Sequence, residues 1–285
     1  MLEDELESYL KRCENRGLSP NSVYLYKSIL SRAAVKVREL GKTSFVDLTP
    51  DDVYEVVGMW SGISPNTRHG YLKIFEEFVE WMGCDAVKAA DILVPKTVPH
   101  RVRVSDLQLR TALGAASSDL RMVMVLGSMM GLRRKEIMGI RLSDIRKDGI
   151  LVHGKGHGTE GKMAIQYMPE GVKKEISEYM KVRGSASDLL VVVRDRSGKV
   201  RNDMGYRNSW VTNEYQKLSA QVGFKITSHS MRRFFGTSIY RSTGDIMLTK
   251  SALRHESIET TQIYIQTEED KMRSAINSIE KIIIY

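Results

Sequence analysis

Two prolines four residues apart, Pro95 and Pro99, lie in a segment that breaks the otherwise mainly helical patterning of this chain. Proline lacks a backbone N–H and restricts the residue before it, so the pair favours an extended linker. We therefore predict a linker at residues 93–103. A chain of 285 residues is long enough for a domain with its own core on each side of it.

Residues 1–92 carry helix signals and no strand signals. At Ser19-Pro20, Thr49-Pro50 and Ser64-Pro65, an N-cap residue precedes proline at the first helical position. With the apolar spacing of residues 3–15, these signals predict a compact domain of four helices. The expected helices are 3–15, 20–40, 50–60 and 65–82.

Residues 104–285 predict a mostly helical domain with a small sheet, of the α+β class. A capping box at Ser105-Asp106-Leu107-Gln108 begins it. Ile150–His153 and Lys162–Tyr167 are patterned as paired strands, and Leu189–Val193 suits a short buried strand. Helices are expected at about 106–116, 118–130, 133–141, 169–183, 203–221, 229–241, 245–254, 257–265 and 268–282.

Charge is distributed unevenly along the chain. Residues 1–100 hold 12 Lys and Arg against 15 Asp and Glu, whereas the remainder holds 31 against 20. A basic second half fits a polyanionic partner, because basic side chains displace counterions from nucleic acid. A solvated basic surface is the alternative from charge alone.

Two predicted helices of the first domain carry basic side chains that could contact DNA phosphates. Candidates are Lys27, Arg32, Lys36, Arg68 and Lys73. From each helix alone, a solvated basic face explains them equally well.

No apolar run approaches the roughly 20 residues of a membrane span, and the acidic start has no signal-peptide core. The two cysteines, Cys13 and Cys84, have no metal-ligand spacing. We expect a cytoplasmic protein with free thiols.

Three clusters in the second half point to phosphodiester chemistry. They are Gly131–Glu136, His229–Arg232 and His255–Tyr264. Arginine suits such chemistry, because its planar, permanently charged fork grips two phosphate oxygens. Arg133 and Arg232 are the candidates, with Arg134 competing for the first position and Glu136 placed to brace Arg133.

Tyr264 is the candidate nucleophile, since cations at a bound phosphate would favour its phenolate. His229 and His255 are candidate proton-handling groups, although a lone histidine is more often structural. The leaving oxygen needs an acid, for which Lys155 in a Gly-Lys-Gly turn is the candidate and Lys162 the alternative.

We expect neither metal nor cofactor. His153 and His157 lack a cysteine or carboxylate that would complete a metal site, and a GxxxxGK[ST] phosphate-binding loop is absent. Two arginines can neutralise the charge that a divalent ion often neutralises in phosphoryl transfer.

Taken together, these segments resemble the tyrosine recombinase (phage integrase) family. The matching segments are Gly131–Ile137, Gly154-Lys155-Gly156, His229–Arg232, Leu253-Arg254-His255 and Thr260–Tyr264. The resemblance implies a helical core-binding (SAM-like) DNA-binding domain at 1–92 and a catalytic domain at 104–285. It implies that Arg133, Lys155, His229, Arg232 and His255 surround the scissile phosphate and that Tyr264 attacks it.

The implied reaction passes through a 3′-phosphotyrosyl link and needs no ATP. With no segment before residue 1 for an arm-binding domain, the chain is most similar to the compact Xer type, archaeal members included. That similarity implies resolution of chromosome dimers at a dif-like site.

There are three alternatives. They are integration of a mobile element, a type IB topoisomerase-like activity, and a DNA-binding protein without the chemistry. One departure is His157–Gly161, which follows the Gly-Lys-Gly turn where the family often has another basic residue.

An apolar helical stripe in the C-terminal tail predicts a packing surface. It comprises Met272, Ala275, Ile276, Ile279 and Ile283. Packing on its own domain is one explanation. The resemblance implies the other, docking into a neighbouring subunit to form a homotetramer on double-stranded DNA.

Overall fold

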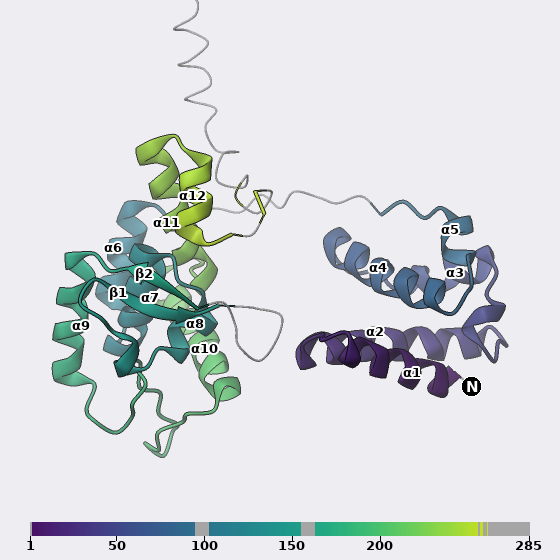
Figure 1. Ribbon diagram of the computed structural model, residues 1–285, viewed down its shortest axis with the longest axis horizontal. Coiled ribbons are helices and arrows are strands. Elements are labelled where there is room, and N and C mark those ends of the chain that lie inside the picture. The colour runs from purple at the N-terminus through teal and green to yellow at the C-terminus, as the bar shows by residue number, and fades with distance from the viewer. Residues whose placement is uncertain (1, 95–102, 155–162, 256, 259–260, 262–285) are drawn as a thin grey trace, which may run out of the picture. The chain divides into compact units, whose positions relative to one another are not determined.

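The computed structural model describes residues 2–94, 103–154 and 163–255, together with 257, 258 and 261. The chain forms two compact units, Met1–Arg101 and Val102–Tyr285. Figure 1 shows both units. The structure confirms the expected fold class, which is mainly helical with one small sheet in the second unit.

The regular secondary structure of the first unit is all helical among its described residues. Its helices are α1 (Leu2–Asn15), α2 (Pro20–Glu39), α3 (Pro50–Gly58), α4 (Pro65–Trp81) and α5 (Ala86–Ala90), with a 3₁₀ turn at Phe45–Asp47. Ser19, Thr49 and Ser64 cap α2, α3 and α4 with their side chains, as predicted. The sequence did not predict α5, because it has five residues and Asp85 makes no side-chain cap bond.

Aromatic rings pack against one another in the core of the first unit. Phe45 and Phe78 meet edge to face with ring centroids 4.7 Å apart, and Tyr9 contacts Phe78 at 5.0 Å. Phe45, Phe75 and Phe78 are fully buried. Such aromatic pairs add to the stabilisation that burial alone provides. Buried residues of α1, α2, α3 and α4 all belong to this one core.

In the second unit a two-stranded sheet lies against the helices (Figure 1). Its helices are α6 (Asp106–Ala115), α7 (Ser118–Met130), α8 (Arg134–Gly139), α9 (Glu170–Val182), α10 (Met204–Val222), α11 (Ser228–Thr243) and α12 (Ile246–Leu253), with a 3₁₀ turn at Leu142–Asp144. Strands β1 (Gly149–His153) and β2 (Met163–Tyr167) pair antiparallel, with Leu151 opposite Ile165. The helices expected at 257–265 and 268–282 lie almost wholly outside the described residues. Among the described helices, none has the length and apolarity that crossing a bilayer requires.

The strand predicted at Leu189–Val193 is wrong. These residues are buried, but Leu189 forms only an isolated bridge with Arg141. Isolated backbone bonds and side chains satisfy the backbone here instead of a neighbouring strand; Leu190 N donates to Ile140 O, and Arg201 N donates to Val193 O. The buried Arg183 donates to the carbonyls of Leu189 and Leu190. Arg207 donates to Val191 O, and Val192 N donates to the Tyr179 hydroxyl. Apolar patterning therefore reported burial here and not secondary structure.

Close packing of α7 against α11 places the end of one beside the start of the other. A Cβ at Gly127 would lie 2.8 Å from Met231 Cβ, and one at Gly131 would lie 2.4 Å from the Phe235 ring. Gly131 also ends α7 in the left-handed conformation, with φ of 65°. Glycine is therefore required at Gly131 for both reasons.

Candidate active site

Arg232 is the most deeply buried of the candidate cations that the structure describes, with 6% of the residue exposed. It lies one turn into α11, and its guanidinium donates to Gly131 O and Leu253 O. The first carbonyl belongs to the end of α7 and the second to the end of α12. Two fixed acceptors from separate helices therefore orient this guanidinium before any ligand arrives.

Arg133 stands at the N-cap of α8 and is braced by Glu136. The backbone N of Arg133 donates to Glu136 Oε2 at 2.7 Å, and its Nη1 donates to Oε1 at 2.9 Å. The Glu136 side chain is 4% exposed, whereas that of Arg133 is 38% exposed. The carboxylate is therefore held inside, while part of the guanidinium faces outward.

Arg254 joins the same carboxylate from the other side. Its Nη2 donates to Glu136 Oε2 and its Nη1 to Gln166 Oε1, both at 2.7 Å. Burial lowers the pKa of this guanidinium, Glu136 opposes that shift, and Arg133 adds to it. The backbone of Arg254 is left-handed, with φ of 52°. An L-residue holds this conformation at a cost of about 1 kcal/mol or more, which the surrounding contacts must offset.

His255 is close enough to both Arg133 and Arg232 for their positive charges to act on its imidazole. Its ring Nδ1 is 3.0 Å from the hydroxyl oxygen of the buried Thr261, and its backbone N donates to Lys250 O. Burial, then Arg232, then Arg133 lower the pKa of the imidazole to about 4. His255 is therefore neutral at physiological pH.

The structure thus brings Arg133, Arg232 and His255 together at the end of α12. Arg133 Nη2 lies 3.4 Å from Arg254 O, which adds a contact from α8 to that segment. By contrast, the adjacent Arg134 donates to Thr212 Oγ1 on α10 at 2.7 Å. Of the two neighbouring arginines, only Arg133 takes part in the Glu136 network.

The remaining predicted site residues are placed only in part. His229 lies in the first turn of α11 with an exposed side chain, three residues before Arg232. Lys155, Lys162 and Tyr264 lie outside the described residues. The strands that precede and follow the 155–162 segment are placed, however, and β2 is tied to α12. Gln166 Nε2 contacts Ala252 O at 3.4 Å while its Oε1 accepts from Arg254.

Among the described residues, no group of three or more His, Cys, Asp or Glu side chains is placed to hold a metal ion. His153 Nε2 is 3.8 Å from Asp144 Oδ1, and His157 lies outside the described residues. The charge of an anion at this site would be met by guanidinium groups.

The basic candidates of the first unit are held differently. Lys36 pairs with Glu55 at 3.3 Å on the surface, and Lys73 with Glu76. Lys27 and Arg32 are exposed and form no ion pair with the described residues. Arg68 is half-buried, and its Nε has no hydrogen-bond partner in the described structure. Of these side chains, Lys27 and Arg32 are the ones exposed to an external anion without an ion pair to the described residues.

Arg254, Gln166 and Thr261 were not predicted from the sequence as residues of this site. Arg254 stands directly before His255, so its place in the motif was visible, but nothing in the sequence shows that it meets Glu136. Gln166 and Thr261 carry no local signal, because their contacts join residues distant in sequence or depend on the fold.

Comparison with known proteins supports the chemistry that this geometry suggests. The model of the phage integrase family matches residues 103–271. The tyrosine recombinase XerA of Pyrococcus furiosus is 26% identical over 291 residues, covering 98% of this chain and 96% of that protein. The tyrosine recombinase XerC of Caldanaerobacter subterraneus is 32% identical over 153 residues. That match covers 52% of this chain and only 41% of the relative.

Among solved structures, the XerH site-specific recombinase bound to a palindromic difH substrate, in a post-cleavage complex, has a similar fold. The TM-score is 0.68 at 16% identity, covering 96% of this chain and 84% of that one. The family match spans the Arg133, Arg232 and His255 cluster and more than half of the sequence. The chain therefore belongs to the phage integrase family, the tyrosine recombinases, enzymes that break and rejoin DNA.

Proposed function

We propose that this protein is a site-specific recombinase of the Xer type, which exchanges DNA strands through a 3′-phosphotyrosyl intermediate. The observation that carries the proposal is the meeting of Arg133, Arg232 and a neutral His255 at the end of α12. A phosphodiester approaching such a group finds oriented positive charge. Stabilisation of developing charge by fixed donors commonly lowers the barrier of such reactions more than any other single effect.

The proposed step begins with Tyr264 as the phenolate, which the nearby cations favour and which forms by loss of its proton to water; its oxygen attacks phosphorus. The O–P bond to tyrosine forms as the bond from phosphorus to the 5′ oxygen breaks. Lys155 protonates the leaving oxygen, with Lys162 as the alternative donor. The 5′ hydroxyl of another duplex then attacks the phosphotyrosine, so the bond energy is conserved and no ATP is consumed.

Arg133 and Arg232 hold the non-bridging oxygens of this phosphate, while Glu136 keeps Arg133 oriented. His255 and His229 position the phosphate and assist proton transfer. If the Thr261 hydroxyl donates to His255 Nδ1, then Nε2 carries the ring hydrogen and donates to a phosphate oxygen. A neutral imidazole suits that role, since it adds a directed donor without a further positive charge.

Arg254 has a positioning role in this proposal. It links Glu136 to Gln166, and Gln166 belongs to the strand that follows the Lys155 segment. Arg254 therefore connects β2, which follows Lys155 in the chain, to Glu136, the carboxylate that orients Arg133. Arg254 thus helps to position both Arg133, which holds the phosphate, and the segment that carries Lys155, without contacting the reacting atoms itself.

Residues 1–92 are proposed as the DNA-binding domain, with contacts from Lys27, Arg32, Lys36, Arg68 and Lys73. The partner is double-stranded DNA. The XerH recombinase, which has a similar fold, is bound to a palindromic difH substrate. The chain is proposed to assemble as a tetramer through residues 268–285. It is also proposed to act in the cytoplasm.

The test of the chemistry replaces Tyr264 with Phe and uses a nicked suicide substrate, which traps the covalent adduct. The wild-type protein should form a protein–DNA adduct, and Tyr264→Phe should form none while binding the same DNA. An adduct that persists in Tyr264→Phe would assign the nucleophile elsewhere.

A second assay separates the possible activities. Products that join two different duplexes support recombination, whereas resealing of the same strand alone supports a topoisomerase-like enzyme. Mapping covalent sites across the host genome then distinguishes a dif-like chromosomal site from the ends of a mobile element. Deletion of residues 268–285 should weaken assembly more than binding to a single site.

A further inference from the structure

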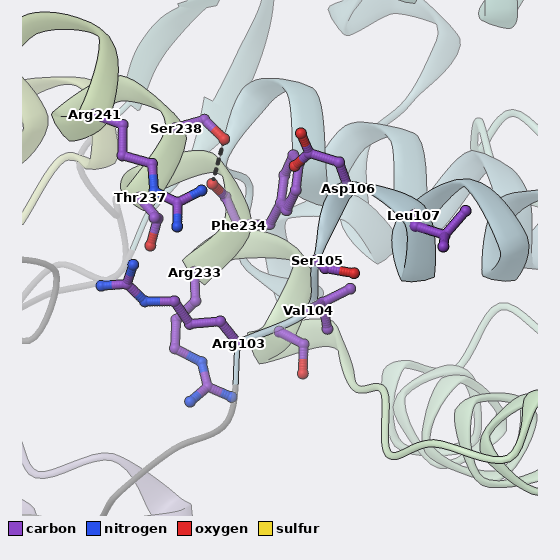
Figure 2. A pocket seen from close by; sticks show the side chains of 11 residues that line it. Arg103, Val104, Ser105, Asp106, Leu107, Arg233, Phe234, Thr237, Ser238 and Arg241 are labelled. Atoms are coloured by element: carbon purple, nitrogen blue, oxygen red, sulfur yellow. Dashed lines mark hydrogen bonds between the residues drawn. The ribbon is translucent and has the colours of Figure 1, made fainter. Parts of the chain in front are cut away.

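A cavity of about 430 Å³ lies in the second unit between the start of α6 and one face of α11. Three arginines line it, Arg103, Arg233 and Arg241, against one carboxylate, that of Asp106. In Figure 2 the three guanidinium groups gather on one side of the cavity, while Asp106 and Leu107 lie on the other. The cavity therefore has a basic wall and a net positive lining.

Hydroxyl groups complete the polar lining. Ser230, Thr237 and Ser238 are spaced along the same face of α11 as Arg233 and Arg241. Thr237 and Ser230 are buried, so they lie deep in the wall and not at its rim. The Ser238 hydroxyl donates to Phe234 O, and the Ser230 hydroxyl pairs with that of Thr227. The guanidinium groups, which are usual donors to phosphate oxygens in protein–DNA contacts, are therefore the main donors of this lining.

The cavity is distinct from the candidate active site but shares its helix. Successive residues on an α-helix point about 100° apart. Arg232 is directed to Gly131 O and Leu253 O, whereas its neighbour Arg233 lines the cavity. One rigid helix thus presents two basic surfaces at a fixed separation.

We propose that this cavity binds a backbone phosphate of the DNA substrate other than the scissile one. The inference rests on the proposed function, since it places that phosphate on the same duplex. With one phosphate at Arg232 and a second at Arg233 and Arg241, α11 sets which phosphodiester reaches the tyrosine. The apolar part of the lining, which includes Val104 and Phe234, suits the deoxyribose beside such a phosphate.

The test compares the double variant Arg233→Ala/Arg241→Ala with the wild-type protein and with Arg196→Ala. Arg196 is exposed in the same unit and outside the cavity, so it controls for loss of charge. Binding of an uncleaved duplex is measured between low and high salt. Each arginine that contacts a phosphate should reduce the slope of log affinity against log salt by about 1. We expect a decrease of about 2 for the double variant and a smaller effect for Arg196→Ala.

A methylphosphonate scan locates the contact, because it neutralises one phosphate at a time. One non-scissile position should weaken wild-type binding and have no added effect in the double variant. The variant Arg233→Lys/Arg241→Lys keeps both charges and should retain most of the salt slope, and thermal unfolding reports whether each variant folds.

Three results would overturn the proposal. One is an unchanged salt slope in a folded double variant. The second is a loss of self-association with DNA affinity intact, which would mean that the cavity receives a protein segment. The third is thermal stabilisation of wild-type protein by inorganic phosphate, absent in the double variant, with unchanged DNA binding, which would mean a free-anion site. These assays use binding alone, so they remain decisive even if no covalent adduct forms.

Discussion

The two units hold their cations in opposite ways. In the second unit, Arg232 is buried and fixed by two carbonyls, and Arg133 is fixed by a carboxylate that is itself buried. In the first unit, Lys36 and Lys73 form ion pairs on the surface, and Lys27 and Arg32 are exposed. Exposed pairs of this kind contribute about 0–1 kcal/mol to stability.

This difference separates two tasks that the same charge can perform. A guanidinium held by carbonyls meets a phosphate without losing further side-chain entropy, so its geometry can favour a transition state. A mobile lysine on a helix surface attracts any phosphate backbone and releases counterions. Rate should therefore depend on the first group and affinity on the second.

The largest effect should follow removal of Arg232. Arg232→Ala should lower the rate of covalent adduct formation at saturating DNA by about 10²–10³-fold, by analogy with the loss of an oxyanion-hole donor. Arg232→Lys should recover little of that rate, because one ammonium cannot reach both carbonyls and a phosphate. If Lys27→Ala slowed the saturated rate as much as Arg232→Ala, the division between rate and affinity would be lost.

The next effect concerns Arg254, which orients other groups. Arg254→Ala should slow adduct formation about tenfold at saturating DNA, which corresponds to roughly 1.4 kcal/mol of activation free energy. DNA affinity should change little. Gln166→Ala should have a similar effect, and the double variant should be little worse than either single change, because both break one link. Fully multiplicative losses would show that the two residues act separately.

A smaller effect is expected at the first unit. Lys27→Ala/Arg32→Ala should weaken DNA binding to all sequences and reduce the salt slope by about 2, since each phosphate contact contributes about 1. The adduct rate at saturating DNA should stay at the wild-type value. Titration of binding at several salt concentrations, followed by a single-turnover assay, measures both quantities, and a slope equal to that of wild type would remove these residues from the DNA interface.

The smallest effect concerns pH. The pKa of His255 is about 4 in the folded chain, against about 6.5 when unfolded, so the unfolded chain binds more protons between these values. Stability should therefore fall as pH drops from about 6.5 towards 4. Discounted for the partial exposure of the ring, the loss is about 1 kcal/mol, or about 2–4 °C in Tm.

His255→Gln is the matched control for that pH effect, because glutamine keeps a polar side chain and does not titrate. Melting curves at pH 7.5 and 5.0 should show a smaller acid-induced decrease for the variant than for the wild-type protein. Equal decreases would mean that other groups account for the acid sensitivity.

Helix starts were predictable from the sequence because their causes are local. Ser19, Thr49 and Ser105 cap their helices within three residues, so the signal and the structure share one window. The Leu189–Val193 segment failed for the opposite reason. Its backbone partners include Arg183 and Arg207, and nothing in the local pattern identifies them.

The same distinction applies to the candidate site. The pairing of Arg133 with Glu136 spans three residues and was anticipated, whereas Arg254 reaches Glu136 across 118 positions and was not. The roles of Lys155 and Tyr264 stay predictions, since both lie outside the described residues. Motifs therefore identified the chemistry, and only the fold showed which groups orient it.

At Gly131 the orientation of a charged group, the Arg232 guanidinium, depends on an apolar contact with the Phe235 ring. Its carbonyl receives Arg232, while its α-carbon lies against the ring of Phe235 on the same helix as that arginine. Any larger residue there would displace the ring and tilt the guanidinium without altering a single ionisable group. A genetic screen for inactive alleles should therefore recover substitutions at this glycine alongside those at the arginines, although it supplies no side chain to the chemistry.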